Sequence, residues 1–458
     1  MKVPYLTLLL SMNRLYGTLG FLVVGNRPSS VVQSGFQASA SSSVVATKAP
    51  PSWEALSENL LSNESVAEEP VLTLYRDTNG WCPFCERVWV ALRVKNIPYR
   101  ESLIPLQDKP QWYKDLVPTT LVPAVLFHDN NNNKDDNNNK NERRIVWESM
   151  DILKALDEAF PDTPQLVADT PEFEEAMKEV NELFSAGISY QFSSRNDTLT
   201  EADVNALREG FLSKLDDLDT ALATSGGPFR GGSDFTALDA SMIPTMERWR
   251  YQLPITMGVD ITEGRPNVQK WFDTLDHYSP YASRVAGDEY SWTAVASTFL
   301  RYFGGDEGNP KVAAAIERAD AAAETLTRAF GNVVDLPGAE FAGEAARKLI
   351  SNHEAVVNDC TRKEPKSQKH LPRASSAETA DLVLRHVASV LVDGSDDPVT
   401  FAESTPLVEL DGDSSRDGAL AARTVASRLC VPRDMSAPAA KTLRAVLSIT
   451  ADRLEKGT

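Results

Sequence analysis

Cysteine is scarce in this sequence. Only four cysteines occur among 458 residues: Cys82, Cys85, Cys360 and Cys430. Four cysteines are too few for a fold that is stapled by disulfides. Cys82 and Cys85 form a Cys-x-x-Cys motif, a spacing that is typical of redox chemistry or of metal binding.

The sequence also has too little positive charge for a protein that binds nucleic acid. With 46 basic and 65 acidic residues, its formal net charge is −19. Because a phosphate backbone would repel such a chain, nucleic acid is excluded as a partner. The acidic balance favours solubility and gives no indication of a role at a membrane surface.

Acidic residues are missing from the N-terminal segment, where the first one is Glu54. The apolar stretch from Val3 to Val24 is interrupted by Asn13, Arg14 and glycines. These interruptions argue against a membrane-spanning helix, so we expect no integral membrane domain in the mature protein. A run rich in serine and alanine follows, from Ser34 to Ala46.

An apolar start followed by an acid-poor, serine-rich run has the composition of a targeting segment. The two parts in tandem resemble a bipartite plastid presequence. We therefore predict that residues 1–53 are a presequence that is removed, and that the protein is located in a plastid. The alternatives are the secretory pathway, or the cytoplasm with a disordered tail.

Residues 68–163 contain short apolar runs and amphipathic segments. The patterns predict strands at 71–75, 99–103, 123–128 and 144–147, and helices at 86–95, 109–116 and 149–160. An Asn/Asp/Lys-rich insertion, 129–143, lies between the last two strands. It cannot pack a core, so it is expected to be a lengthened hairpin loop. This order of elements predicts an α/β thioredoxin-like domain.

The pattern becomes helical beyond residue 170. An all-α domain is predicted over 170–304, with helical spacing at 172–186, 201–224, 236–251 and 267–279. Thr236 stands three residues before Asp239, which is the signature of a capping box. An additional α-helical region of unknown role is predicted over 305–458, with helices at 310–330, 340–360, 378–392, 418–429 and 437–456.

The motif Cys82-Pro83-Phe84-Cys85 lies between a predicted strand and a predicted helix. Unpaired N–H groups and the dipole at a helix start stabilise a thiolate, which is the nucleophilic form of cysteine. Pro83 suits the first helical position. Cys82 is therefore the predicted nucleophile. Cys85 is either a resolving thiol or a buried structural thiol.

A zinc site is disfavoured because the sequence has no second Cys-x-x-Cys motif and no histidine pair near the first one. We therefore expect no metal. The remaining residues of metal-ligating type in the C-terminal region are expected to be scattered. They are His353, Cys360, His386 and Cys430.

Several stretches resemble the cysteine-type glutathione transferases: WCPFCERVWVALRVKNIPY, KPQWYKDL, LVPAVLF and WESMDILKALDEAFP. They are most similar to the lambda class and also similar to the omega and dehydroascorbate reductase classes. The stretch GGPFRGGSDFTALDASMIPTMERW resembles the capping segment of the helical domain in the same family. The resemblance covers Val71 to Ser283 and leaves the helical C-terminal extension unassigned.

This resemblance implies a glutathione S-transferase of the thiol transferase type, in which glutathione is the co-substrate and Cys82 forms a mixed disulfide with it. The other substrate would be a glutathionylated or disulfide compound, or dehydroascorbate. The implied glutathione contacts are Phe84, Lys109, Val122, Pro123, Glu148 and Ser149.

Three of these contacts have implied roles. Glu148 and Ser149 suit the γ-glutamyl end of glutathione, which carries an ammonium and a carboxylate, although an isolated pair would more simply cap a helix. Lys109 suits the glycyl carboxylate. The resemblance also implies that the Val122–Pro123 bond is cis.

One residue departs from the family pattern. The related motifs usually carry Ala or Ser at the position of Cys85, so the sequence leaves open whether an internal disulfide forms. Two other functions also remain open: a non-catalytic carrier of hydrophobic ligands in the interdomain cleft, and an interaction protein acting through its helical tail. The sequence does not distinguish a monomer from a homodimer.

Overall fold

The computed structural model describes residues 49–61, 69–128, 144–193, 198–303, 309–333, 337–362 and 373–457. The predicted presequence, apart from residues 49–53, and the Asn-rich insertion lie outside these residues. The described chain forms two compact units. Of the described residues, the first unit contains those from 69 to 325, and the second combines residues 49–61 with the chain from Leu326 onwards.

A four-stranded mixed sheet organises the start of the first unit. Its strand order is β2-β1-β3-β4, with β1 (Leu72–Asp77), β2 (Tyr99–Ile104), β3 (Ala124–Phe127) and β4 (Ile145–Trp147). β1 is parallel to β2 and antiparallel to β3, which in turn is antiparallel to β4. The parallel pair requires a crossover, and α3 (Pro83–Val94) supplies it. The predicted thioredoxin-like order of elements is confirmed.

Each face of the sheet is covered by helices because β1 carries apolar residues on both faces. Leu72 and Leu74 belong to the core that contains α3 and α5 (Ser149–Ala159). Tyr75 points to the opposite face, where it packs against Tyr113 of α4 (Gln111–Leu116). This alternation is the expected consequence of strand geometry.

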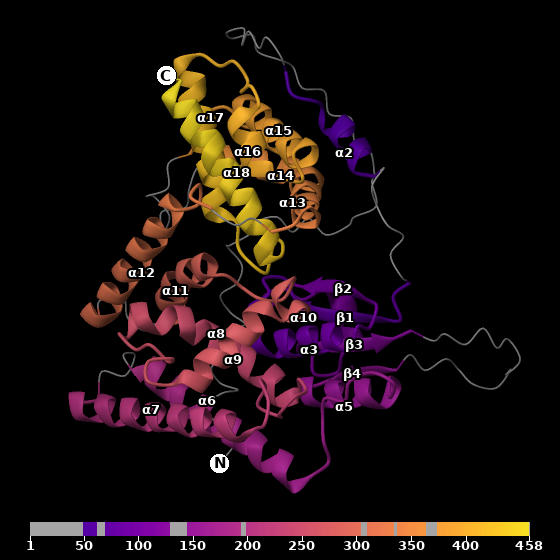
Figure 1. The fold of residues 1–458 in the computed structure, drawn as a ribbon, viewed down its shortest axis with the longest axis vertical. Helices are drawn as coiled ribbons and strands as arrows, with labels where there is room; N and C mark the ends of the chain where they lie inside the picture. The colour runs from indigo at the N-terminus through magenta and orange to yellow at the C-terminus, as the bar shows by residue number, and fades with distance from the viewer. Residues whose placement is uncertain are drawn as a thin grey trace, which may run out of the picture. The chain divides into compact units, whose positions relative to one another are not determined.

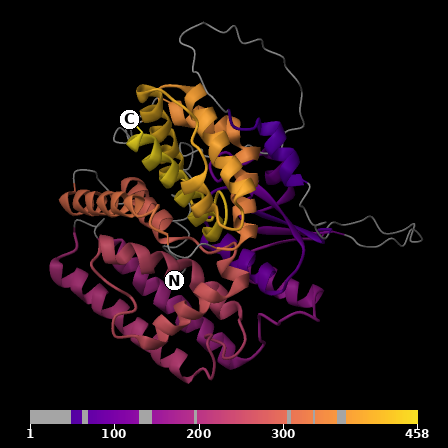
Figure 2. The ribbon, with the colours of Figure 1, turned by 45° about the horizontal axis from the view of Figure 1, so that its top comes forward.

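The rest of the first unit is helical, as predicted. Its helices are α6 (Pro171–Gln191), α7 (Glu201–Thr224), α8 (Ala237–Thr256), α9 (Pro266–His277), α10 (Ser279–Ala282), α11 (Glu289–Phe303) and α12 (Pro310–Arg328). The long helices α6 and α7 lie side by side (Figures 1 and 2). Gly187 lets α6 approach α8, since a Cβ at that position would lie 2.1 Å from the Trp249 ring. The predicted capping box of Thr236 and Asp239 is present at the start of α8.

α12 determines where the first unit ends. The expected boundary between residues 304 and 305 is too early, because the unit extends to Thr325. Arg318 of α12 donates hydrogen bonds to the carbonyl oxygens of Ile255 and Thr256 at the C-terminal end of α8. A guanidinium in that position satisfies carbonyl groups that lack helical partners.

The second unit is an alanine-rich helical bundle. It contains α2 (Trp53–Leu61), α13 (Ala339–Ser351), α14 (His353–Thr361), α15 (Ala377–Asp393), α16 (Pro398–Ser404), α17 (Gly412–Arg428) and α18 (Ala437–Lys456) (Figure 1). Small residues let these helices approach closely, and a Cβ at Gly418 of α17 would lie 2.8 Å from Val383 of α15.

One predicted helix of the second unit is wrong. The segment 340–360 forms two helices, because Asn352 interrupts it. The Asn352 side-chain amide donates to the carbonyl oxygen of Lys348 at 2.8 Å. An asparagine that binds the backbone in this way favours the end of a helix.

The N-terminal helix α2 is part of the second unit, and it begins at the last residue of the predicted presequence. Trp53 is buried in the core of this unit, where its ring stacks on His353 at 4.6 Å. Its Nε1 donates to Asp381 of α15 at 2.7 Å. Arg385 donates to the carbonyl oxygen of Pro50. Removal of residues 1–53 would remove the contacts of Trp53 and of Pro50.

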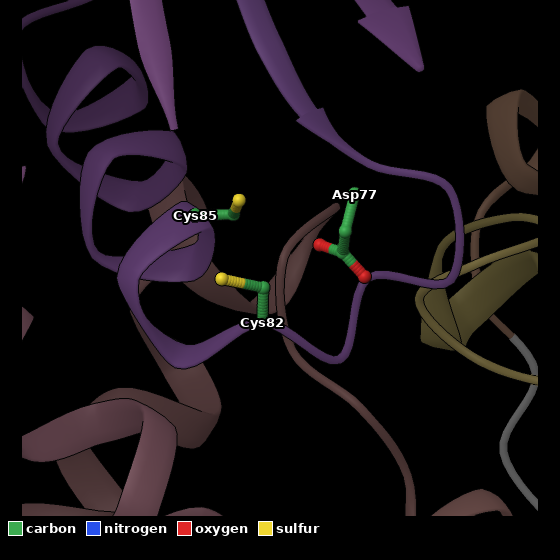
Figure 3. Close-up of side chains that lie close together, drawn as sticks. All are labelled: Asp77, Cys82 and Cys85. Atoms are coloured by element: carbon green, nitrogen blue, oxygen red, sulfur yellow. The ribbon is translucent and has the colours of Figure 1, made fainter. Parts of the chain in front are cut away.

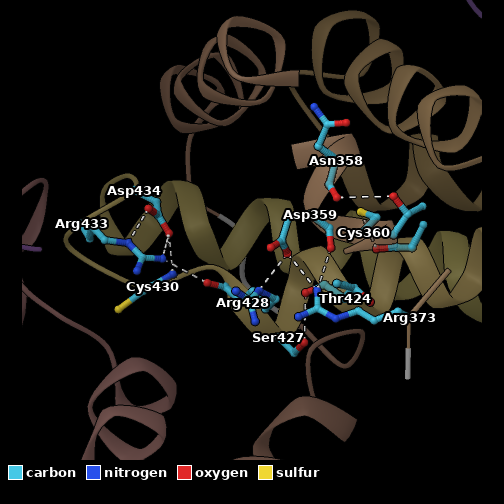
Figure 4. Close-up of polar contacts among 12 residues, drawn as sticks. Asn358, Asp359, Cys360, Arg373, Thr424, Ser427, Arg428, Cys430, Arg433 and Asp434 are labelled. Carbon is cyan, nitrogen blue, oxygen red and sulfur yellow. Dashed lines mark hydrogen bonds and ion pairs between the residues drawn. The ribbon is translucent and has the colours of Figure 1, made fainter. Parts of the chain in front are cut away.

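Buried ion pairs join the helix ends of the second unit (Figure 4). Asp359 accepts contacts of 2.9 Å from both Arg373 and Arg428. Arg433 pairs with Asp434 at 2.7 Å, and Asp434 also accepts from the backbone N–H of Cys430. None of the described helices is long and apolar enough to span a membrane.

We predict that Trp53→Ala destabilises the second unit selectively. Deletion of a buried tryptophan costs about 3–5 kcal/mol of unfolding free energy because it leaves a cavity. Hydrogen exchange followed by mass spectrometry should show faster exchange in α13 and α15 and unchanged exchange in β1 and α3. Glu58→Gln, at an exposed position of the same helix, is the control. Equal protection in both variants would contradict the assigned packing of α2.

Candidate active site

Cys82 occupies the N-cap position of α3. Pro83 is the first helical residue, as predicted, and the backbone N–H of Glu86 donates to the carbonyl oxygen of Cys82 at 3.1 Å. The Cys82 side chain is 8% exposed and makes no capping hydrogen bond. Its sulfur therefore stands beside the unpaired N–H groups of the first helical turn, which favour negative charge.

The loop before β3 lies across from the Cys82 sulfur. Cys82 Sγ is 4.0 Å from the carbonyl oxygen of Val122. The Val122–Pro123 peptide bond is cis, as predicted, and Pro123 is buried. Backbone polar groups of this loop are therefore presented next to the thiol.

Lys109 is buried close to the same thiol. Its Nζ donates to the carbonyl oxygen of Thr120 at 2.8 Å, and the residue is 8% exposed. Burial lowers the pKa of Lys109, and the nearby Cys82 and Cys85 partly offset this effect. Lys109 is thus a buried cation near the cysteines, and one of its three N–H donors is already used by Thr120.

Glu148 and Ser149 lie at the start of α5. Glu148 is the N-cap residue, is exposed and has a φ of 69°. Ser149 is the first helical residue, so its possible role as the cap of this helix is wrong. Its hydroxyl accepts a hydrogen bond from Arg87 of α3 at 2.9 Å. Arg87 also lies over the half-buried Phe84 ring, 5.5 Å from its centroid.

Cys85 is more deeply buried than Cys82, with 1% of its surface exposed. Burial raises the pKa of Cys85 well above its ordinary value, and the adjacent Cys82 and Asp77 raise it further. Asp77, the last residue of β1, is fully buried and faces both sulfur atoms (Figure 3). The sequence analysis missed Asp77. Its position at the end of a buried strand, five residues before Cys82, was the available signal.

Asp77, Cys82 and Cys85 also form a group whose potential metal-ligating atoms lie within 4.8 Å of one another. Within the described part of the chain, His353, Cys360, His386 and Cys430 form no such group. We do not assign a metal to the cysteine group, because its two sulfur atoms are those that thiol chemistry would use.

A buried charge cluster fixes the first turn of α3 to α8. Arg248 forms an ion pair with Glu86 at 2.9 Å and donates to the carbonyl oxygen of Trp81 at 3.1 Å. Glu247 accepts hydrogen bonds from Gly287 N–H and Trp292 Nε1, both at 2.8 Å. With two carboxylates and one guanidinium, the cluster has one negative charge in excess.

Burial is the main cause of the raised pKa of Glu86, and the excess charge adds to it. Burial raises the pKa of Glu86 to about 8; Arg248 opposes this shift, and Glu247 adds to it. Glu247 has several donors to stabilise its charge, whereas Glu86 has only its contact with Arg248. Glu86 is therefore the carboxylate that holds a proton at neutral pH.

A separate cavity of about 780 Å³ lies among the ends of α6, α8, α11 and α12. It is lined mainly by apolar residues, including Phe299 and Ala315. The buried Ser193 hydroxyl lines it and has no hydrogen-bond partner in the described structure. Phe299 also packs edge-on against Trp81, the residue before Cys82, with ring centroids 5.5 Å apart.

These features define a thioredoxin-like protein with an attached helical domain and a cysteine at the start of its first crossover helix. A family model described as "Glutathione S-transferase, N-terminal domain" matches residues 81–159. Another, described as "Glutathione S-transferase, C-terminal domain", matches residues 151–274. Both matches fall within the first unit.

Two relatives from Arabidopsis thaliana extend this likeness. Glutathione S-transferase L2, chloroplastic, of Arabidopsis thaliana is 32% identical over 203 residues, which are 44% of this chain and 62% of that protein, less than two thirds of its length. Glutathione S-transferase L1 of the same plant is 30% identical over 229 residues, 48% of this chain and 84% of that one. The chain therefore belongs to the glutathione S-transferase family.

A solved structure of the dehydroascorbate reductase of Chlamydomonas reinhardtii is 20% identical to this chain. The match covers 54% of this chain and 98% of that one, with a TM-score of 0.38.

We predict that Glu86 makes the stability of the protein decrease towards alkaline pH. Its ordinary pKa is 4.5, and its folded value is about 8. The folded state therefore binds this proton more tightly than the unfolded state does. Its stabilising contribution is complete below pH 4.5 and is lost as the pH rises through 8.

Denaturant unfolding of the Glu86→Gln variant between pH 6 and 9 checks this prediction. Relative to the parent protein, the variant should gain stability between pH 6 and 8 and keep a constant advantage above pH 8, since glutamine resembles the protonated acid. Glu158→Gln, at an exposed carboxylate, is the control. A constant stability difference at every pH would contradict the prediction.

Proposed function

We propose that this protein is a glutathione-dependent thiol transferase that reduces mixed disulfides or small oxidised substrates through Cys82. The observation that carries the proposal is the position of Cys82 at the N-cap of α3, 4.0 Å from the carbonyl oxygen of the cis-proline loop. A thiolate is stabilised at the helix start, and the adjacent loop can bind an extended peptide through its backbone.

The proposed reaction begins when the Cys82 thiolate attacks the glutathione sulfur of a glutathionylated substrate. A bond forms between Cys82 and glutathione, the old disulfide breaks, and the substrate leaves as a thiolate. A second glutathione thiolate then attacks the mixed disulfide and releases oxidised glutathione and Cys82. Since each leaving group is a thiolate, the reaction needs no strong general acid.

Glutathione would be held by groups on three sides of Cys82. The Glu148 carboxylate suits the γ-glutamyl ammonium, and the backbone N–H of Ser149, at the first position of α5, suits the γ-glutamyl carboxylate. Val122 would pair with the cysteinyl backbone. Lys109 would offer its remaining N–H donors to the glycyl carboxylate, and Phe84 and Pro123 would limit access to the sulfur.

Three further proposals go with this function. Location in a plastid is supported by the serine-rich, acid-poor N-terminal composition and by the name of the relative L2, which is given as chloroplastic. Our proposed partners are glutathione and a disulfide substrate. The second unit is proposed to be an accessory helical module rather than part of the thiol site.

A second candidate function is a carrier of apolar ligands. The cavity of about 780 Å³ favours it, because this volume is typical of small-molecule sites. In this case Cys82 would be dispensable, and ligand binding would survive its substitution. The activity of Cys82 variants therefore distinguishes the two functions.

We expect Cys82→Ser to reduce glutathione-dependent reduction of hydroxyethyl disulfide by at least about 100-fold, because a serine hydroxyl does not replace a thiolate nucleophile. A coupled assay that consumes NADPH through glutathione reductase measures the rate, and circular dichroism checks folding. Cys360→Ser, at a buried cysteine of the second unit, is the matched control. Unchanged activity of Cys82→Ser would refute the enzyme function.

We expect Glu148→Gln to raise KM for glutathione by roughly 10- to 100-fold, since a hydrogen bond to a charged group is worth about 1.5–3 kcal/mol. The value of kcat should change much less, because Glu148 would bind the peptide away from the reacting sulfur. Asp151→Asn, at an exposed carboxylate three residues further along, is the control. A loss of kcat with unchanged KM would contradict the assigned contact.

A further inference from the structure

Cys82 and Cys85 differ in their place on α3 and in how deeply they are buried. Cys82 lies at the helix start, whereas Cys85 is inside the first turn and 1% exposed. Burial and the neighbouring Cys82 and Asp77 hold the Cys85 proton in place. Because only a thiolate attacks a disulfide, Cys85 can resolve a mixed disulfide only if a nearby group accepts its proton.

Asp77 is placed to be that acceptor. Its ligating oxygen and the two sulfur atoms all lie within 4.8 Å of one another (Figure 3). Asp77 Oδ2 accepts a hydrogen bond from the backbone N–H of Trp81 at 2.8 Å, which fixes the carboxylate. Asp77 Oδ1 is buried and has no hydrogen-bond partner in the described structure. An unpaired buried carboxylate oxygen is costly, which calls for a functional explanation.

The neighbouring cation does not neutralise this carboxylate. Arg76 directs its guanidinium to Glu101 of β2 at 2.6 Å and binds only the backbone carbonyl of Asp77. The other charged or titratable groups that act on Asp77 or Cys85 are Glu86 of α3, Lys109 before α4 and Tyr113 of α4. None of these three donates a hydrogen bond to Asp77 Oδ1.

We propose that Asp77 accepts the proton of Cys85 when Cys85 attacks the Cys82–glutathione mixed disulfide, so that the protein can work as a dithiol enzyme. This inference rests on the proposed function, which supplies the mixed disulfide. It assigns Asp77 as a proton acceptor for the reaction and Cys85 as the resolving thiol.

The step balances as a thiol–disulfide exchange. The Cys85 S–H proton moves to the Asp77 carboxylate, a bond forms between the sulfur atoms of Cys85 and Cys82, and the bond between Cys82 and glutathione breaks. Glutathione leaves as a thiolate, which takes up a proton. Two further glutathione molecules then reduce the Cys82–Cys85 disulfide and become oxidised glutathione.

The test follows the full-length protein after mixing with oxidised glutathione. Samples are quenched with acid over time, and mass spectrometry measures the Cys82–glutathione adduct and the Cys82–Cys85 disulfide. The parent protein should form the adduct and then close the disulfide with loss of glutathione. Asp77→Asn should form the adduct but close the Cys82–Cys85 disulfide at least tenfold more slowly than the parent protein at pH 7. This difference in rate should become smaller as the pH rises. Asp151→Asn is the matched surface control.

Two additional variants separate proton transfer from a structural effect. Cys85→Ser should accumulate the adduct, and Asp77→Asn should have no further effect in its presence. Glu86 titrates near pH 8, so the closure rates with and without Asp77→Asn are also compared in the Glu86→Gln background. The difference between these rates should still become smaller as the pH rises.

The outcomes distinguish a failure of the proposed function from a failure of the dithiol inference. Absence of any Cys82 adduct in the parent protein would defeat the proposed function itself. An adduct that never closes in the parent protein would defeat the dithiol inference alone and leave monothiol transfer intact. Equal or faster closure in Asp77→Asn would show that the carboxylate only suppresses the Cys85 thiolate, which would overturn its role as acceptor.

Discussion

The contact between Arg248 and the start of α3 is the constraint on which the geometry of the thiol site depends. Arg248 belongs to α8 of the helical part, yet it holds both the Glu86 side chain and the carbonyl oxygen of Trp81. Trp81 and Glu86 flank the cysteine motif on either side. The position of Cys82 is therefore fixed from the helical part of the unit as well as from its own strand and helix.

This arrangement explains why the sheet domain and the helices share one core. Leu72 and Leu74 of β1 lie in the same apolar cluster as Trp249 of α8. A buried ion pair alone gives little net stability, since desolvation offsets the attraction between its charges. The apolar contacts supply the stability, and the Arg248 contacts select one orientation of α3.

The sequence predicted most helices and strands and the position of the Cys82 thiol, because these depend on local patterns. A short apolar run predicted β1, and the position of Cys82 between a strand and a helix placed it at the start of that helix. Long-range features were not accessible. No local signal shows that α2 joins helices some 300 positions later, which depends on the Trp53–Asp381 contact. The orientation of Lys109 towards Thr120 likewise depends on how two loops pack.

The residues proposed to contact glutathione were predictable only in part from the sequence. Ser149 was identified as a site residue from its place after a strand, but its hydroxyl is engaged by Arg87. Only the folded arrangement of α3 and α5 brings these two side chains together. The backbone N–H of Ser149, rather than its hydroxyl, is then the donor best placed for a carboxylate, because a first-turn N–H has no helical partner.

The protonation of the site and its thiol chemistry are coupled because several acids share one buried region. Asp77, Cys82, Cys85 and Glu86 can each carry a negative charge, and Arg76 is already paired with Glu101. Like charges at this separation in a poorly hydrated interior cannot all be ionised together. In the proposed mixed disulfide, Cys82 would carry no negative charge, so ionisation of its neighbours would be less unfavourable. Formation of this mixed disulfide would thus make the Cys85 proton easier to release at the stage when a second thiolate is needed.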